Sequence, residues 1–219
     1  MKYLREFNSE SDVQIFVRPN VVLINDTGKV LYNVDPLVGV YVQHIDGSFY
    51  TTAQWTEKGF SNDLANGVAV VANEASFVIS KLQISDSLLW SSNTEEEIPG
   101  VTLTSDKDVA MADYNGESNT AIIAAASTMG AANECANYVF PNGNKGYLPA
   151  LGEWEVAFAN KAQIDAAMSL IGGTAIKEAY HWTSTQYSAS RAWTRSWSGD
   201  YQGNYSKITR IPVRAFTSL

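Results

Sequence analysis

The side chains that most often bind metals or attack substrates are few in this chain and far apart. His44 and His181 have no other His or Cys at the spacing of a zinc site, and the single cysteine, Cys135, cannot form an internal disulfide. Asp106 and Asp108 could act as paired carboxylates, but two acids in the run SDKD between apolar residues are typical of an exposed loop. We therefore predict no catalytic residue, no metal site, no cofactor and no enzymatic activity.

Two short motifs resemble known binding loops without completing them. The run Asp113–Gly116 is similar to part of a calcium loop, but Met111 and Ile122 stand where an EF-hand needs oxygen ligands. We predict an Asx turn there, leading into a helix at Ser118. The glycines and lysine of residues 143–146 follow a helical pattern instead of opening one, so we predict a turn and not a phosphate-binding loop.

The last forty residues, 180–219, differ in composition from the rest of the chain. They hold three of the six Trp and four of the eleven Tyr, and their net charge is +4 against −12 for residues 1–179. Tyr, Trp, Ser, Gly, Asn and Arg together are typical of a paratope. Trp182 and Trp193 lie in β-type runs beside small residues, so we expect them in the core. Seven aromatic side chains cannot all be buried in this polar segment, and we predict a binding surface.

The elements that would position this surface follow from hydrophobic periodicity and turn residues. We expect a β-hairpin over 38–45 and 48–55, strands over 67–73 and 76–84, a loop over 85–100 with three exposed glutamates, helices over 118–127 and 131–140, one long helix over 150–173, and strands over 181–188, 191–197, 201–206 and 210–216. Helices between two groups of strands indicate an α+β fold with antiparallel sheets and two helices, the first of which is interrupted at Met129 and Gly130. Cys135 lies in an apolar helical pattern, where a buried thiol is the usual state.

Residues 1–35 form a separate N-terminal segment in this interpretation. Two β-type runs, 14–24 and 29–34, flank a turn at 25–28 and are too short to bury a core. Exposed strand edges pair with other strands, so we predict that this segment serves attachment or homo-oligomerisation. The boundary falls near Asp35 and Pro36, and residues 36–219 form the main domain.

Charge and hydropathy exclude several classes of protein. At 219 residues with a net charge of −8, the chain does not have the basic surface of a nucleic-acid-binding protein. No apolar run approaches the ~18 residues of a membrane span, so we predict no membrane insertion. The N-terminal run MKYLREFNSESD is not followed by an apolar stretch of signal length, and we expect no standard cleaved signal peptide.

Three motifs in the second half resemble a known family. They are the run GYLPALGEWEVAFANKAQIDAAMSLIGGTAI from Gly146 to Ile176, the run YHWTSTQYSASRAW from Tyr180 to Trp193, and the ending IPVRAF at 211–216. Together they resemble the variable proteins of diversity-generating retroelements of Bacteroides-type bacteria and their phages. The resemblance covers about residues 37–219, and residues 1–35 are similar to short N-terminal segments of phage structural proteins. It implies a C-type lectin-like fold of the formylglycine-generating-enzyme subtype.

The resemblance also implies which residues vary, within a variable region of about 180–211. A reverse transcriptase that miscopies adenines in AAY codons cannot produce Trp, Gln or Lys, so we expect a fixed scaffold of Trp182, Gln186, Trp193, Trp197, Gln202 and Lys207. The remaining set consists of residue types that AAY codons can reach. We expect them on one displayed, ligand-binding face: His181, Arg191, Thr194, Ser196, Asp200, Tyr201, Gly203, Asn204, Tyr205, Ile208, Thr209 and Arg210.

The chain differs from the oxidases and the lectins that share the implied fold, and these differences argue against two functions. The oxidases of this subtype use a Cys pair, whereas this chain has one Cys, and the sugar-binding tripeptides of calcium-dependent lectins are absent. We expect a hypervariable receptor-binding protein that binds a bacterial surface protein or glycan, on a phage tail tip or otherwise outside the cell. The alternatives are a bacterial cell-surface or secreted adhesin and, third, a formylglycine-generating-type oxidase.

Overall fold

The computed structural model describes the main chain of residues 4–6, 17–24 and 30–36 and all atoms of residues 37–219. The described strands are β1 (Leu4–Glu6), β2 (Val17–Ile24), β3 (Val30–Pro36), β4 (Gly39–His44), β5 (Phe49–Tyr50), β6 (Ala65–Val71), β7 (Ser76–Ser80), β8 (Ser85–Leu88), β9 (Tyr180–Gln186), β10 (Arg191–Ser196), β11 (Gln202–Ser206), β12 (Ile211–Val213) and β13 (Phe216–Ser218). The α-helices are α2 (Thr52–Glu57), α3 (Lys107–Met111), α4 (Gly116–Ala126), α5 (Ala131–Asn137), α6 (Leu151–Ala159) and α7 (Lys161–Leu170).

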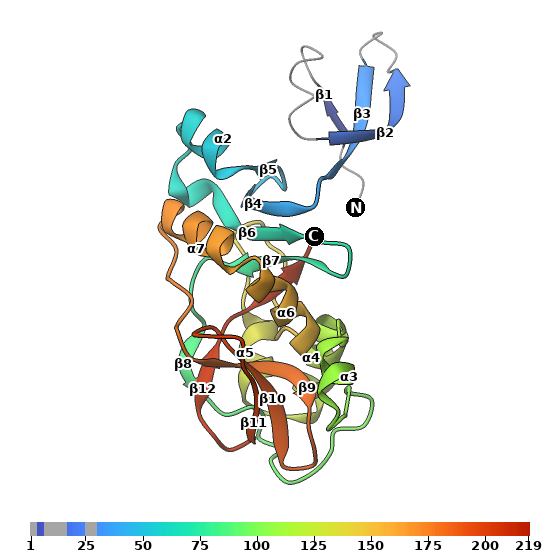
Figure 1. The fold of residues 1–219 in the computed structure, drawn as a ribbon, viewed down its shortest axis with the longest axis vertical. Coiled ribbons are helices and arrows are strands. Elements are labelled where there is room, and N and C mark those ends of the chain that lie inside the picture. Colours follow the sequence, from blue (N-terminus) through green and yellow to red (C-terminus); the bar gives the residue numbers. More distant parts are fainter. Residues whose placement is uncertain (1–3, 7–16, 25–29) are drawn as a thin grey trace.

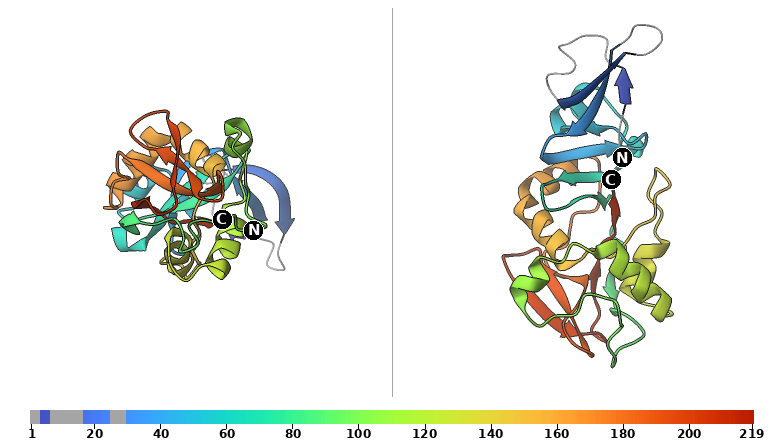
Figure 2. Two further views of the ribbon diagram at one scale, coloured as in Figure 1. Left: turned by 90° about the horizontal axis from the view of Figure 1, so that it is seen from below. Right: turned by 90° about the vertical axis from the view of Figure 1, so that its right-hand side faces the viewer.

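These elements form an elongated α+β molecule, as the order of the sequence patterns led us to expect (Figure 1). The N-terminal sheet, with strand order β1-β3-β2, lies at one end. The five-stranded sheet β13-β7-β6-β4-β5 follows, and the sheet β11-β10-β9 lies toward the opposite end. A second view shows the same order along the long axis, with helices packed beside the sheets (Figure 2). All strand pairs within these sheets are antiparallel.

The five-stranded sheet packs against a hydrophobic cluster on each of its two faces, because strand β6 places apolar side chains on both faces. Val68 and Val70 of β6 pack in one cluster with α6 and α7, whereas Ala69 between them packs in a second cluster with Trp90 and Trp182. Successive side chains of a strand point to opposite faces, so one strand contributes to two cores. The C-terminal strand β13 pairs with β7 and thereby joins the end of the chain to this sheet.

The N-terminal segment forms a sheet by itself in the part that is described. Strands β2 and β3 pair as an antiparallel hairpin, as predicted from the two β-type runs, and β1 adds to the other edge of β3. The predicted turn at 25–28 lies outside the described residues. β3 ends at Pro36 and β4 begins at Gly39, so the expected boundary near Asp35 falls at the end of a strand.

Several local predictions were wrong. The main domain was expected to have two helices, but residues 37–219 contain six α-helices, and the single strand expected over 210–216 forms β12 and β13 in two different sheets. Residues Thr52–Glu57 form a helix and not the second half of a hairpin strand, because the Thr51 hydroxyl accepts from Gln54 N–H and the Gln54 side chain accepts from Thr51 N–H. Ser85–Leu88, expected as loop, pairs with β12 as a strand. The long helix is broken between α6 and α7 at Asn160, whose side-chain amide donates to Val156 O at 2.9 Å.

Candidate binding surface

The three-stranded sheet β11-β10-β9 carries most of the predicted variable region. β10 is central, and its register with β11 runs without interruption from Arg191 opposite Ser206 to Arg195 opposite Gln202. Its register with β9 shifts between Ala192 and Thr194. The sheet therefore has two outer strands: β11, which pairs regularly with β10, and β9, whose residues from His181 to Gln186 are all buried.

The tryptophans expected as fixed scaffold are buried and hold neighbouring segments through their indole N–H groups. Trp182 Nε1 donates to Leu88 O at 2.8 Å, and Trp193 Nε1 donates to Thr104 O at 2.8 Å. Trp197 Nε1 donates to the carboxylate of Asp165 on α7 at 3.2 Å. Each of these side chains thus combines a large apolar contact with one directional bond to a distant part of the chain.

Gln186 and Lys207 attach the loop that contains the three glutamates. The Gln186 side chain exchanges two hydrogen bonds of 3.0 Å with the main chain of Ile98. The Lys207 ammonium donates to Gln186 Oε1 and to Glu96 O, and lies 4.7 Å from the centre of the Trp90 ring. Burial lowers the pKa of Lys207 to about 8, against the raising effect of the nearby glutamates. Both side chains are fully buried, whereas Gln202 on β11 is only half-buried.

Nine of the twelve predicted display positions reach the surface, along β11 and the turns at its ends. Arg191, Asp200, Tyr201, Ile208 and Arg210 are exposed, and Gly203, Asn204, Tyr205 and Thr209 are half-exposed. Tyr201 and Ile208 are 65% and 62% exposed, which marks them as the large apolar side chains of this surface. The surface is defined by these nine residues and is called the β11 surface below.

The remaining three display positions are buried, so the expectation that all twelve share an exposed face was wrong for them. His181 packs its ring 5.1 Å from that of Trp154, and burial lowers the pKa of His181 to about 3. Thr194 lies in the central strand, and the Ser196 hydroxyl bonds to Ser198 Oγ at 2.9 Å. Reachability through the genetic code carries no information about burial, and all three side chains lie on β9 and β10, whose residues between His181 and Gln186 and between Ala192 and Ser196 are buried.

Arg195 is a supporting residue of this surface that the sequence did not single out. Its guanidinium is buried, donates to the carbonyls of Ser196, Gly199 and Tyr201, and pairs with Asp200 at 2.9 Å. It also lies 3.7 Å above the ring centre of Phe158, with Nε 2.8 Å from a Glu155 oxygen. These contacts fix the turn from β10 to β11 that presents Tyr201. The available signal in the sequence was the position of Arg195, two residues from both Trp193 and Trp197 and therefore on the same face of a strand as these two apolar side chains.

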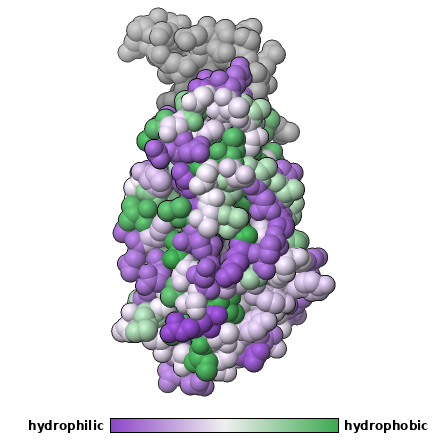
Figure 3. Space-filling model, turned by 90° about the vertical axis from the view of Figure 1, so that its left-hand side faces the viewer, coloured by the Kyte–Doolittle hydropathy of each residue, from purple (hydrophilic) through white to green (hydrophobic). Residues whose placement is uncertain are grey.

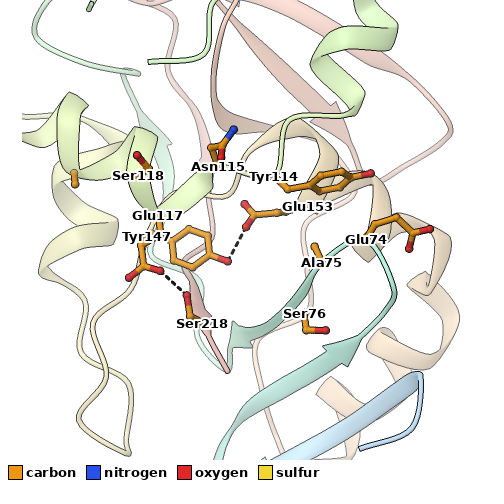
Figure 4. A pocket seen from close by; sticks show the side chains of 11 residues that line it. Glu74, Ala75, Ser76, Tyr114, Asn115, Glu117, Ser118, Tyr147, Glu153 and Ser218 are labelled. Atoms are coloured by element: carbon orange, nitrogen blue, oxygen red, sulfur yellow. Dashed lines mark hydrogen bonds between the residues drawn. The ribbon is translucent and has the colours of Figure 1, made fainter. Parts of the chain in front are cut away.

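A separate pocket of about 520 Å³ lies away from the β11 surface, between α4, the start of β7 and the end of β13 (Figure 4). At its floor the Tyr147 hydroxyl donates to Glu153 Oε1 at 2.9 Å, and Ala150 N–H donates to Glu153 Oε2 at 2.7 Å. Burial raises the pKa of Glu153 to about 8. Both acceptor oxygens are thus engaged in holding the start of α6, which gives this carboxyl a structural role.

The other motifs with chemical potential also have structural partners. Asp113 Oδ1 accepts from Asn115 N–H at 3.0 Å, which confirms the predicted Asx turn, and its second oxygen accepts from Thr185 Oγ1 at 2.7 Å. Asp106 caps α3. Cys135 is buried, and burial raises the pKa of its thiol, so it is not poised as a nucleophile. In residues 37–219 no cluster of three or more His, Cys, Asp or Glu side chains is arranged to hold a metal.

The hydropathy of the surface is mixed elsewhere. One long face of the molecule shows hydrophilic residues interleaved with small hydrophobic patches, without a broad apolar area (Figure 3). None of the described helices is long and apolar enough to cross a membrane.

Comparison with known proteins identifies a fold and not a family. No family model matches the chain, and no curated protein matches it. Among solved structures, it is similar to the crystal structure of a fimbrial protein from Bacteroides ovatus ATCC 8483, with a TM-score of 0.58 and 12% sequence identity. The match covers 84% of this chain and 49% of that chain, so this chain spans about half the length of its structural neighbour. At this identity the likeness shows that the two chains share a fold.

Proposed function

We propose that this chain is a receptor-binding protein that displays variable side chains on a fixed scaffold. The observation that carries the proposal is the division within residues 180–211. Side chains on β11 and its flanking turns reach the surface, while the tryptophans, Gln186 and Lys207 of the same segment are buried and hold loops from elsewhere in the chain. Binding residues on exposed segments supported by a rigid framework can change without changing that framework.

The proposal also covers the fold of the scaffold and the source of the diversity. The scaffold is a C-type lectin-like domain, and the diversity arises by adenine-directed reverse transcription, as in the variable proteins that the sequence resembles. The oxidase alternative is set aside in this proposal, because the oxidases of that subtype use a Cys pair and this chain has a single Cys, which is buried. The ligand is a protein or glycan of a bacterial surface.

Two locations fit this function, and they define the leading and the second candidate. The first is the tail tip of a phage, suggested by the similarity of residues 1–35 to phage structural segments. The second is a bacterial adhesin, favoured by the solved structure with the same fold, which is named a fimbrial protein. Phage tail genes beside this gene would support the first, and genes for surface-fibre assembly would support the second.

DNA sequencing around the gene tests the mechanism of diversity. We expect a reverse-transcriptase gene and a near-identical copy of the region that encodes residues 180–211. In that copy, AAY codons should stand at exposed positions such as Tyr201 and Ile208, and the codons of Trp182 and Gln186 should be unchanged. Absence of any such repeat, or a repeat with AAY codons at the buried tryptophans, would overturn the proposed mechanism.

The N-terminal sheet provides attachment or self-association in this proposal. It lies at the end of the molecule away from the β9-β10-β11 sheet, so copies joined through it could present several β11 surfaces together (Figure 1). Joined modules can gain about 10²–10⁴ in avidity without new contacts. Light scattering should show an oligomer for the full chain and a monomer for a chain beginning at Leu37. A monomeric full-length chain at micromolar concentration would leave attachment to another protein as the role of this sheet.

A further inference from the structure

Strand β11 has one edge that the described chain leaves open. The bonds from Ser196 N–H to Tyr201 O and from Lys207 N–H to Ser190 O fix which groups face β10. By alternation, the main-chain groups of Gly203 and Tyr205 point to β10, and those of residues 202, 204 and 206 point away. Asn204 O accepts from Arg191 Nη2, and Ser206 O accepts from Thr209 N–H. In residues 37–219 the outward N–H groups of 202, 204 and 206 have no partner.

Two other sheet edges in the main domain are covered, and a third belongs to a very short strand. The outer edge of β9 is closed by main-chain bonds from Gln186 N–H to Thr102 O and from Thr104 N–H to Gln186 O. The outer edge of β13 is closed by two bonds between Tyr147 and Phe216. β5 has only two residues. By contrast, β11 has five residues in regular register and contains no Pro, Lys or bulge, which are the usual means of blocking an edge.

The open edge lies within the β11 surface, between the exposed side chains of Tyr201 and Ile208. Its outward N–H groups at residues 202, 204 and 206 are present whatever side chains occupy the variable positions, except where a proline would stand. Outward groups on every second residue repeat at about 6.6–7 Å, which is the spacing of groups along an extended peptide. Such an edge can supply constant main-chain bonds while the neighbouring side chains select the partner.

We propose that the partner of this surface is a protein that adds an extended segment to the sheet as a fourth strand beside β11. This inference rests on the proposed function and names the partner's chemistry. Exposed Arg191 and Arg210 flank the strand, while the carboxylate of Asp200 is paired with Arg195, so the segment should carry acidic side chains. Arg191 covers the carbonyl of Asn204, and that oxygen retains a second lone pair for an incoming N–H group.

The test uses a random library of linear dodecapeptides displayed on phage, selected on the full-length chain, with affinities then measured for synthetic peptides. We expect acidic peptides to be enriched. Asn204→Pro removes an outward N–H that β10 does not use, and Asn204→Ala removes the same side chain but keeps the N–H. Asn204→Pro should weaken peptide binding at least tenfold more than Asn204→Ala does. Equal effects of the two variants would overturn strand addition.

Hydrogen exchange on the unaltered chain gives a second readout that does not depend on the folding of a proline variant. In the free chain the amides of Gly203 and Tyr205 should exchange slowly, and those of 202, 204 and 206 should exchange fast. A saturating selected peptide should slow the exchange of these three amides. Peptide binding that leaves the exchange of these three amides unchanged would contradict the proposal.

A double variant separates this inference from the proposed function. Tyr201→Ala with Ile208→Ala removes the two large exposed apolar side chains of the surface. If the double variant weakens binding while Asn204→Pro and Asn204→Ala remain equal, the surface binds ligand without strand addition. If a glycan array gives ligands whose binding needs Tyr201 and Ile208 and the peptide library gives none, strand addition is overturned and the proposed function stands. If no ligand depends on either set, both are overturned.

Discussion

The two outer strands of the sheet β11-β10-β9 lie in one segment of sequence and have opposite environments. In β9 the residues from His181 to Gln186 are buried and the outer edge is closed by main-chain bonds to residues 102 and 104. In β11 every residue is half-exposed and the outer edge is open. The sheet thus joins a rigid side, attached to loops and helices, to a side whose only described strand partner is β10. Side chains on β11 can therefore change without altering the buried contacts of β9, because β10 lies between the two strands.

Trp182→Ala is expected to have the largest effect, because it removes a side chain from the rigid side. Trp182 is fully buried in the second core cluster, and its indole N–H bonds Leu88 O. Removal of a buried Trp costs about 3–5 kcal/mol of unfolding free energy. Tyr201→Ala on the open side is the matched control and should change it by less than about 0.5 kcal/mol. Urea unfolding measures both, and similar losses would remove the division between the two strands.

Two glutamines, one on each outer strand, sharpen the same comparison. Gln186→Leu leaves Ile98 N–H and C=O without their partners and takes one acceptor from Lys207. Each buried polar group left unpaired costs about 1–3 kcal/mol, so we expect a loss of about 2–4 kcal/mol. Gln202→Leu removes exposed or half-exposed bonds to Glu155 and Asp200 and should cost under about 1 kcal/mol. A larger effect for Gln202→Leu would mean that β11 is part of the support.

The sequence predicted the α+β class, the N-terminal hairpin and most strands, because periodicity and turn residues report local structure. It placed the tryptophans inside and the segment 180–211 partly outside. It did not place His181, Thr194 and Ser196 inside, because burial on a central or covered strand depends on residues far along the chain. Thr194 is covered where Tyr180 and Tyr205 meet around Gly203, and this arrangement exists only once three strands have paired.

The broken helix shows the same limit. The apolar stripe from Trp154 to Ile171 is continuous in sequence, but Asn160 ends α6 and precedes α7. Its side-chain bond to Val156 O competes with the helix, and both halves keep their apolar side chains in the same core cluster. Arg195 was missed for a related reason, since its partners come from α6 and from the following turn. Local patterns predict which face of an element is apolar, but they do not predict which buried polar groups form hydrogen bonds with each other.

Buried Glu153 and His181 give the support a pH dependence below pH 8. The pKa of Glu153 is raised from 4.5 to about 8, so its contribution to stability is present at low pH and is lost as pH rises toward 8. The pKa of His181 is lowered from 6.5 to about 3, so its contribution is present above pH 6.5 and is lost as pH falls toward 3. Between pH 4.5 and 6.5 the two slopes oppose each other. Between pH 6.5 and 8 the loss from Glu153 continues without the opposing slope of His181.

Glu153→Gln should therefore flatten the neutral to alkaline limb of the stability profile. A fully shifted group changes the unfolding free energy by about 1.4 kcal/mol per pH unit, so the unaltered chain should lose about 1–2 kcal/mol between pH 6.5 and 8. The Gln variant should lose much less over that range. Urea unfolding at both pH values measures the difference, and Glu178→Gln, at an exposed carboxylate, serves as the control. An equal slope in the Glu153 variant and the unaltered chain would contradict a buried, protonated carboxyl.

The smallest effect is expected from changes confined to the β11 surface. Tyr201, Ile208 and Arg210 are exposed, and the side-chain hydrogen bond from Arg210 to Ser87 O is long, at 3.4 Å. Changing all three to Asn should shift the unfolding free energy by about 1 kcal/mol or less in total, because exposed substitutions usually stay within about ±0.5 kcal/mol each. Thr194→Asn is the informative contrast: Thr194 is also reachable from an AAY codon, but it is fully buried, so a larger polar side chain there overpacks the site. Thermal melts should give a lower melting temperature for the single Thr194 variant than for the triple variant. The reverse order would show that tolerance in this segment follows codon reachability and not burial.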